Sequence, residues 1–490
     1  MEIFPILLIP LALAGIAVLP GVRAGRSRKF GVLNAAGHFA NAALAVLLAL
    51  GLMRSGGPAS FFGFFYADLL SAFFILTISV INFISALYSI GYISADVKDG
   101  VMSERKAKAY YSLFNLFALS MLCVPVVSNL GMVWVAIEVT TLVSAFLVGF
   151  YNKKESIEAA WKYIIICSVG ITLALLGTIL FYYTASRDGG ISSLNWTDME
   201  TVAGSLNPSI LKVAFLFILV GYGTKAGFVP MHTWLPDAHS QALAPISAML
   251  SGVLLPTAIY AIIRFATITN VCIGTGYTGN LFMLFGLVSL GVGAGFVLVQ
   301  RDIKRLLAYS SVENIGIIAT GLGFGGTVAI YGALFHVFNH AAAKSLMFFA
   351  AGRAVKKYKS HNIREIRGII SAMPFAGAML IIGVFALTGS PPFSAFFSEI
   401  MILLAGFKMG LWPQAALLLL FMAVAFGAIV FNISRPVFGG KPEGMPVEGE
   451  PLSGKLAFGI LLLLICVMGI AAPGLFRDLL LAASEIIRGA

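Results

Sequence analysis

Long apolar stretches separated by short polar segments make up most of the chain. Fourteen of these stretches have about the 20 residues that an α-helix needs to cross about 30 Å of hydrocarbon. They cover residues 3–22, 31–53, 68–92, 110–128, 130–150, 160–184, 209–231, 241–265, 277–299, 304–324, 327–352, 371–409 with a break, 412–433 and 455–476. The turn sequence SNLG at 128–131 divides two stretches that otherwise read as one. The pattern predicts an all-α, polytopic membrane protein with about fourteen transmembrane helices.

Composition supports this class and excludes others. Of the 490 residues 59% are hydrophobic and 11% are charged, whereas soluble domains carry about 25% charged residues. The first stretch lacks a basic start and a small-residue cleavage site, so we interpret it as a retained helix. The net charge of +11 comes from Lys and Arg gathered in the loops of one face, which is the positive-inside pattern. This distribution places both termini on the outer side and argues against nucleic-acid binding.

Redox chemistry is not expected in this chain. Its four cysteines, Cys123, Cys167, Cys272 and Cys466, are solitary, whereas iron–sulfur, zinc and haem-attachment motifs need paired cysteines. No G-x-G-x-x-G loop follows a strand-like run. We therefore expect no cofactor and no metal in this chain.

Several ionisable residues nevertheless fall inside the apolar stretches. Such a residue costs about 2.5–3.5 kcal/mol at the bilayer centre and is by default functional. They are Glu138, Lys162, Lys225, Glu313, His336, His340, Lys344 and Glu399. Acids alternate with bases and imidazoles, and a lysine that moves between a carboxylate and a neutral neighbour changes its proton affinity. The series predicts a proton relay.

Simpler interpretations remain open for some of these residues. Lys162 lies near a helix end and can extend its ammonium group to the interface. Glu313 can brace the neighbouring basic loop RDIKR. His336, His340 and Lys344 are spaced by four residues and share one helix face, which favours a polar lane. We assign His38 no role, because a single imidazole is usually a packed core residue.

Two of the predicted helices contain breaks beside an ionisable residue. GYGTKAGFVPMHTWLP holds Lys225 and ALTGSPPFSAFFSEIMIL holds Glu399; proline removes a backbone donor and interrupts each helix. Broken helices at matching places in two halves indicate inverted-repeat transporters. We therefore expect two inverted five-helix repeats, helices 4–8 and 9–13, with breaks in helices 7 and 12. The expected units are residues 1–109, 110–265, 266–433 and 434–490.

With these residues assembled, the chain resembles the proton-conducting antiporter-like membrane subunits of respiratory complex I, Mrp cation/proton antiporters and membrane-bound hydrogenases. The motifs that carry the resemblance are WVAIEVTTLVSAFLVGFY, KAGFVPMHTWLPDAHSQA, QRDIKRLLAYSS and HAAAKSLMFFAAG. AAWKYIIICSVGITLALLGT and AYSSVENIGII are most similar to the F component of hydrogenase-4 and its formate-hydrogenlyase relatives.

The resemblance implies roles for individual residues. Glu138 and Lys225 would be the charge pair of the first half-channel, and Lys162 a modulating lysine. The histidines His336 and His340 would form a central relay, and Glu399 would end the second half-channel. Many relatives carry a lysine or histidine midway along helix eight, where this chain has Pro256. The link from Lys225 to the central histidines would then need His239 or water.

The resemblance also implies partners. We expect other membrane-arm subunits and a peripheral redox module with nickel–iron and iron–sulfur centres, in the inner membrane of a prokaryote. The short tail after the last helix suggests an interior position or a smaller complex. The alternatives are a subunit of an Mrp-type antiporter without a redox partner, and an inert membrane scaffold.

Overall fold

A computed structural model describes residues 3–18, 27–61 and 63–489. The first half of the chain contains α1 (Ile3–Val18), α2 (Ser27–Ser55), β1 (Ala59–Phe61), β2 (Phe65–Ala67), α3 (Leu69–Lys98), α4 (Glu104–Cys123), η1 (Val124–Val126), α5 (Leu130–Val148), α6 (Lys154–Arg187), α7 (Trp196–Val202), η2 (Ala203–Ser205), α8 (Pro208–Ala226), η3 (Met231–Thr233) and α9 (Trp234–Gln241). The second half contains α10 (Ala244–Met249), η4 (Leu250–Leu254), α11 (Leu255–Ile273), α12 (Thr275–Val299), α13 (Ile303–Phe324), α14 (Gly326–Tyr358), α15 (Ile369–Ala372), α16 (Pro374–Leu387), α17 (Ser394–Lys408), α18 (Trp412–Phe438), α19 (Leu452–Ala471) and α20 (Gly474–Arg488).

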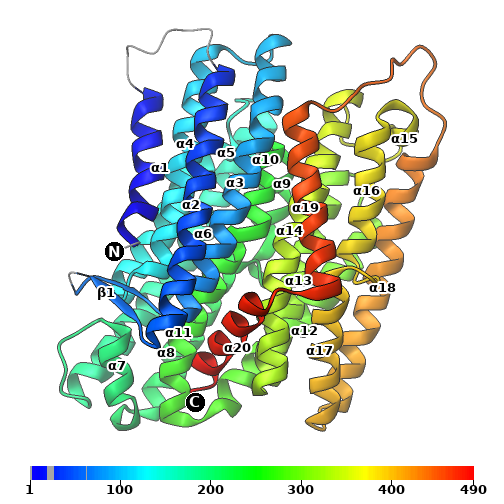
Figure 1. The fold of residues 1–490 in the computed structure, drawn as a ribbon. Coiled ribbons are helices and arrows are strands. Elements are labelled where there is room, and N and C mark those ends of the chain that lie inside the picture. Colours follow the sequence, from blue (N-terminus) through cyan, green and yellow to red (C-terminus); the bar gives the residue numbers. More distant parts are fainter. Residues whose placement is uncertain (1–2, 19–26, 62, 490) are drawn as a thin grey trace.

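The long helices stand side by side in one bundle (Figure 1). Within the described residues, ten helical segments are long and apolar enough to cross a membrane. Each of the fourteen predicted apolar stretches overlaps a helix of the structure. The all-α membrane fold is therefore confirmed, while the exact number of crossings and the inverted repeat stay predictions.

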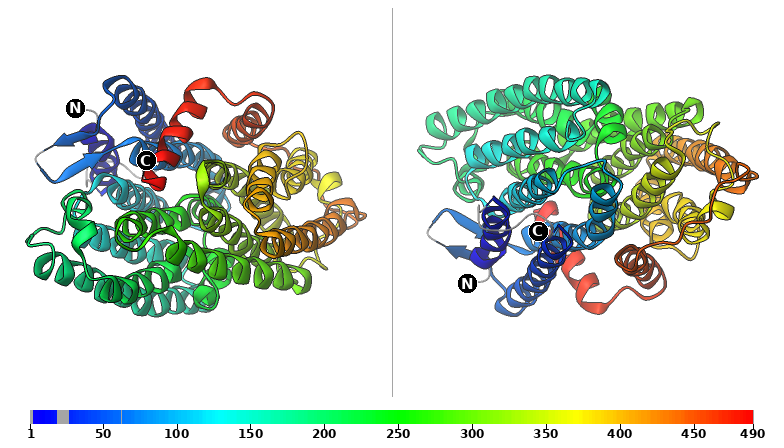
Figure 2. Two further views of the ribbon diagram at one scale, coloured as in Figure 1. Left: turned by 90° about the horizontal axis from the view of Figure 1, so that it is seen from below. Right: turned by 90° about the horizontal axis from the view of Figure 1, so that it is seen from above.

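The helix α14 runs through the interior of the bundle. It packs against α3, α10, α13, α16, α17, α19 and α20. Seen along the bundle, α1 and α2 lie at one edge and α18 at the other, with α14 between them (Figure 2). Residues 332–354 of α14 are buried without interruption, so the polar side chains of this helix point into protein.

Both predicted helix breaks are present. The first follows α8, where Gly227 takes a left-handed conformation (φ 89°) before η3 and α9. The second separates α16 from α17 at residues 388–393. A further irregularity was not predicted: η4 is a π-helical segment that immediately precedes α11 and Pro256. Interrupted helices at membrane depth expose backbone groups that only protein or water can satisfy.

Three small elements were also not predicted. The hairpin β1–β2 pairs Ala59 with Ala67, and it lies with α7 and α20 at one end of the bundle (Figure 1). The helix α20 is apolar on one side only, and it packs on α3 and α14. The expected C-terminal unit 434–490 thus contains two helices, α19 and α20, rather than one. Hydropathy over a full span misses such a helix because its polar face lowers the average.

Candidate functional site

Lys225 lies in the last turn of α8 and is 1% exposed. Its Nζ donates to the hydroxyl oxygen of Thr141 at 2.9 Å and to that of Tyr163 at 2.5 Å. The ammonium group also lies 4.6 Å from the Tyr163 ring centroid and 6.0 Å from that of Trp234. Neutral oxygens and aromatic faces both stabilise an ammonium group. The break after α8 therefore holds a buried amine in a neutral polar cage.

Glu138 lies half-buried on α5, one turn before Thr141. Its Oε1 accepts a hydrogen bond from Ser168 at 3.3 Å, and its Oε2 is buried without a hydrogen-bond partner. The ion pairs of the described residues do not include Glu138 with Lys225. Thr141, which accepts from Lys225, is one turn from Glu138 on α5, so the two charges lie in one neighbourhood without direct contact.

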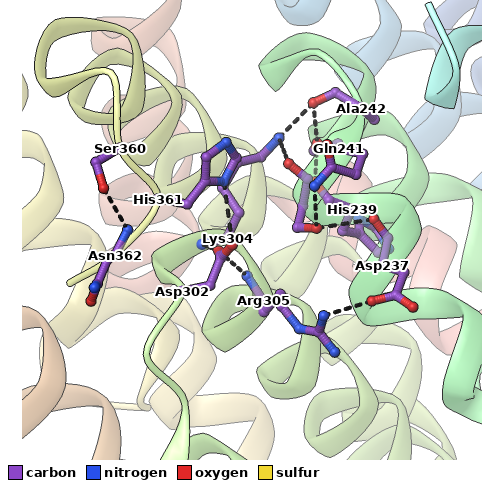
Figure 3. Close-up of polar contacts among 12 residues, drawn as sticks. Asp237, His239, Gln241, Ala242, Asp302, Lys304, Arg305, Ser360, His361 and Asn362 are labelled. Atoms are coloured by element: carbon purple, nitrogen blue, oxygen red, sulfur yellow. Dashed lines mark hydrogen bonds and ion pairs between the residues drawn. The ribbon is translucent and has the colours of Figure 1, made fainter. Parts of the chain in front are cut away.

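Lys162 lies apart from this cage, at the surface. Its side chain is 49% exposed and forms ion pairs with Glu158 at 2.7 Å and Asp237 at 3.3 Å. Asp237 also pairs with Arg305 at 2.7 Å (Figure 3). This placement matches the alternative in which the lysine extends to the interface, and its modulating role stays a prediction.

His239 on α9 is fully buried between two aromatic rings. Its ring centroid lies 6.5 Å from that of Trp234 and 5.4 Å from that of Phe348, with nearly parallel planes. Neither ring nitrogen has a hydrogen-bond partner. The Trp234 ring also lies 6.0 Å from Nζ of Lys225, so Trp234 is next to both the Lys225 cage and His239.

Lys304 is a buried lysine that the sequence pattern did not single out. It lies in the first turn of α13, is 3% exposed, and donates to the carbonyl oxygens of Ser240 at 3.1 Å and Ala242 at 2.5 Å (Figure 3). A cation satisfies the free carbonyl groups at a helix C-terminus, so Lys304 closes the end of α9. Nearly every residue of α13 is buried, so helical spacing in the sequence gave no signal that distinguished Lys304 from its neighbours.

The turn before α13 is held by Asp302. Its Oδ1 accepts from the backbone amides of Lys304 at 2.8 Å and Arg305 at 2.9 Å. Its Oδ2 lies 3.3 Å from Nδ1 of His361 (Figure 3). Burial alone would raise the pKa of Asp302, but the hydrogen bond and charge of His361 and the backbone amides hold it below its ordinary value.

The three residues of the predicted polar lane lie on α14. Lys344 donates to the carbonyl oxygen of Leu307 at 2.7 Å and to the hydroxyl of Ser310, both on α13. His340 is buried with no hydrogen-bond partner on either ring nitrogen. Its ring centroid lies 6.5 Å from that of His336. Three titratable groups therefore follow one another along the inner face of α14.

His336 is held from both sides by neutral partners. Its Nδ1 is hydrogen-bonded to the hydroxyl of Ser398 on α17 at 3.0 Å, and its Nε2 to Oδ1 of Asn314 on α13 at 3.0 Å. The Ser398 hydroxyl also accepts from Asn339 at 3.2 Å. These neutral residues were missed from sequence, because hydropathy patterns mark charged residues in a span more strongly than amides or hydroxyls.

Glu313 and Glu399 complete this second cluster. Glu313 is 6% exposed on α13, is next to Asn314, which donates to it at 3.4 Å, and lies within electrostatic range of Lys344 and Glu399. Glu399 is 7% exposed on α17 and packs against Gly389 in the helix break. The contacts of Glu313 are thus with the buried cluster and not with the basic loop RDIKR.

The two clusters are connected by packing and not by an unbroken chain of side-chain hydrogen bonds among the described residues. Ser251 in η4 is hydrogen-bonded to Ser311 on α13 at 2.7 Å. This pair places polar groups midway along the predicted span 241–265, where many relatives carry a lysine or histidine and this chain has Pro256. His239, Lys344 and His340 are buried titratable groups that lie between Lys225 and His336. The arrangement can transfer protons between these groups only through intervening water or side-chain movement.

Comparisons with known proteins agree with this arrangement. Residues 127–427 match the family described as NADH:quinone oxidoreductase/Mrp antiporter, transmembrane. This range contains both helix breaks and every candidate residue named above. The "Hydrogenase-4 component F homolog" of Methylacidiphilum infernorum is 39% identical over 396 residues, which are 80% of this chain and 82% of that protein.

Solved structures show the same fold. One chain of the membrane-bound sulfane sulfur reductase, an archaeal respiratory membrane complex, superposes with a TM-score of 0.87 at 24% identity, covering 100% of this chain and 98% of that chain. A chain of the Mrp complex from Dietzia sp. DQ12-45-1b gives a TM-score of 0.85 at 19% identity, covering 99% and 97%. The chain belongs to the NADH:quinone oxidoreductase/Mrp antiporter family of transmembrane subunits.

Proposed function

We propose that this chain is the proton-translocating membrane subunit of a multisubunit, hydrogenase-like oxidoreductase related to complex I. The observation that carries the proposal is the succession of buried titratable groups from Lys225 on α8 through His239 to the α14 lane, and on to Glu399 on α17. Ionisable side chains inside a membrane bundle mark ion pathways by default. The similarity to a hydrogenase-4 component F homolog supports the choice of complex.

The chemistry of these groups suits protons better than sodium. Lys225, His340 and Lys344 offer nitrogen atoms that exchange protons, whereas hard cations such as sodium prefer several oxygen ligands around one point. Glu138 and Glu399 would be the acids at the two ends of the route. Glu138 lies near Lys225, and Glu399 lies at the helix break between α16 and α17. Protons would pass from group to group through bound water and side-chain movement.

Energy for pumping would come from partners. Moving one charge against 100 mV costs about 2.3 kcal/mol, so uphill transport has to be coupled to another reaction. We infer that partner subunits with nickel–iron and iron–sulfur centres supply it through redox turnover. The chain would reside in the inner membrane of a prokaryote with both termini on the outer side, as the Lys and Arg distribution suggests.

An Mrp-type cation/proton antiporter without a redox partner is the second candidate. The family description names both classes, and the Lys225 and α14 clusters serve either. An antiporter would be driven by an existing ion gradient and would transport without any electron donor. An inert scaffold is a third interpretation. It does not explain why so many buried titratable groups follow one another from Lys225 to Glu399.

Purification from native membranes distinguishes the candidates. The tagged full chain is isolated in mild detergent, and nickel and iron are measured in the fractions that contain it. Co-migrating nickel and iron, together with acidification of reconstituted vesicles on addition of the electron donor, support the proposed function. Metal-free fractions that exchange protons for sodium in response to a gradient alone would favour the antiporter.

A further inference from the structure

A second group of buried polar side chains lies in the N-terminal helices, before the residues that match the family. It is separate from the succession of buried titratable groups from Lys225 to Glu399, which we call the Lys225–Glu399 line. We refer to it as the N-terminal polar cluster. Its members are neutral or imidazole side chains that are at most 2% exposed: Asn34, His38 and Asn41 on α2, Ser79, Asn82 and Ser85 on α3, and Asn115 on α4. No residue of the cluster carries a fixed charge.

The α2 and α4 members form a hydrogen-bonded group. Nε2 of His38 is hydrogen-bonded to Oδ1 of Asn115 at 3.0 Å, and Nδ2 of Asn115 donates to Oδ1 of Asn34 at 2.7 Å. The Asn115 oxygen accepts, so His38 donates through Nε2 and its Nδ1 is free to accept. This Nδ1 is buried without a partner.

Two contacts place Ser79 and Asn82 of α3 at the level of the α2 members. The Phe39 and Phe83 rings lie 5.3 Å apart, and a Cβ on Gly31 would come 3.2 Å from Ile90. These two contacts fix an antiparallel register between α2 and α3. In that register Asn41 of α2 lies opposite the turns of α3 that carry Ser79 and Asn82.

The cluster contains many buried atoms without a protein partner. They are Nδ2 of Asn34, Nδ1 of His38, Nδ2 and Oδ1 of both Asn41 and Asn82, and the hydroxyls of Ser79 and Ser85. Buried polar groups in native proteins are nearly always hydrogen-bonded to protein or to ordered water. Such a concentration on three packed helices therefore indicates a bound ligand.

The mixture of donors and acceptors identifies the ligand. A cation would be surrounded by oxygens alone, and an anion by donors alone. Here Asn41 and Asn82 each present a donor and an acceptor, whichever way the amide is turned, and His38 presents an acceptor. Water both donates and accepts, and it typically makes about three hydrogen bonds at a buried site.

We propose that α2, α3 and α4 enclose a binding site for a small cluster of water molecules, centred on His38, Asn41 and Asn82. The bound water bridges α2 to α3 at membrane depth. It also places an imidazole, the only titratable group of the N-terminal polar cluster, in contact with water away from the Lys225–Glu399 line.

X-ray hydroxyl-radical footprinting of the full chain in its native complex, in 18O water, tests the proposal, because radicals formed from bound water label the side chains next to it. His38 and the adjacent Phe114, whose ring lies 5.3 Å from His38, should be labelled at least several-fold faster than Phe73, which is equally buried. In Asn41→Leu/Asn82→Leu, labelling of His38 should fall to the rate of Phe73. Thr77→Val, which removes only an intrahelical hydrogen bond to Phe73, should leave it unchanged.

Two results would overturn the proposal. Labelling of His38 and Phe114 at the rate of Phe73 in the unmodified complex would show a dry cluster, and this comparison needs no variant to fold. Thermal stabilisation by sodium or lithium ions that disappears in Asn82→Leu would show a cation site instead.

Discussion

Gly389 lies against the carboxylate of Glu399 in the break between α16 and α17. A Cβ at position 389 would overlap Oε2 of Glu399, and the backbone there is left-handed with φ 62°. Glycine is thus required twice, once for the backbone conformation and once for the approach of the acid. The helix break holds the buried carboxylate in place.

Replacing Gly389 by alanine should displace Glu399 and reduce proton transport at least tenfold. Gly410 is a matched control, because it is also left-handed (φ 76°) but a Cβ there would have nothing within 4 Å. Both alanine variants carry the left-handed penalty of about 1–2 kcal/mol, so only Gly389→Ala adds the clash. Acidification rates of vesicles with equal amounts of assembled complex give the comparison. Equal transport in the two variants would refute the role of this contact.

Tyr163→Phe should slow transport several-fold while assembly is retained. The change removes the hydroxyl that accepts from Lys225 at 2.5 Å and leaves Thr141 as its hydrogen-bond partner. Losing a hydrogen bond to a charged group costs about 1.5–3 kcal/mol, which alters the proton affinity of the lysine. Tyr182→Phe, on the outer face of the same helix, serves as the control. A Tyr163→Phe complex with unchanged transport would contradict the cage around Lys225.

Ser398→Ala should weaken the relay through His336. The hydroxyl of Ser398 is the partner of Nδ1 of His336 and also accepts from Asn339, so its loss leaves buried groups unpaired at about 1–3 kcal/mol. Ser345→Ala is the control, because the Ser345 hydroxyl bonds only to the carbonyl of its own helix. We expect a lower transport rate and a lower thermal midpoint for Ser398→Ala than for Ser345→Ala. Identical values for both would argue against a positioned imidazole.

Stability near α13 should depend on pH through Asp302. Its pKa is held below the ordinary value, against the effect of burial, by His361 and backbone amides. A depressed folded pKa contributes stability above the unfolded value of about 3.9, and this contribution is lost as the pH falls through the folded value. Asp302→Asn keeps an N-cap side chain but removes the charge, so it should be less stable near neutral pH. The difference in thermal midpoint should close below about pH 4, and a difference that stays constant with pH would contradict the assignment.

Sequence predicted the apolar helices and both breaks because hydropathy and proline act locally. The sequence did not show that Lys162 is exposed and Lys304 is buried. Both lie in helices near an end, but Lys162 points to the surface and Lys304 reaches the carbonyl groups at the end of α9. The difference depends on which helix packs beside each lysine, and a single helix pattern does not contain that information.

The neutral hydrogen-bond partners of Lys225 and His336 could not be predicted from the sequence for the same reason. Tyr163, Asn314 and Ser398 are ordinary residues of apolar helices until the fold brings them to Lys225 and His336. The resemblance implies that Glu138 and Lys225 are a charge pair. In the structure the direct hydrogen-bond partners of Lys225 are Thr141 and Tyr163.

The most direct test of the proton relay is donor-driven acidification of vesicles that contain the complex with Lys225→Met. Methionine keeps much of the length of the side chain but cannot carry a proton. The relay predicts that acidification is abolished while the chain still assembles with its partners. Undiminished acidification per electron transferred would contradict it.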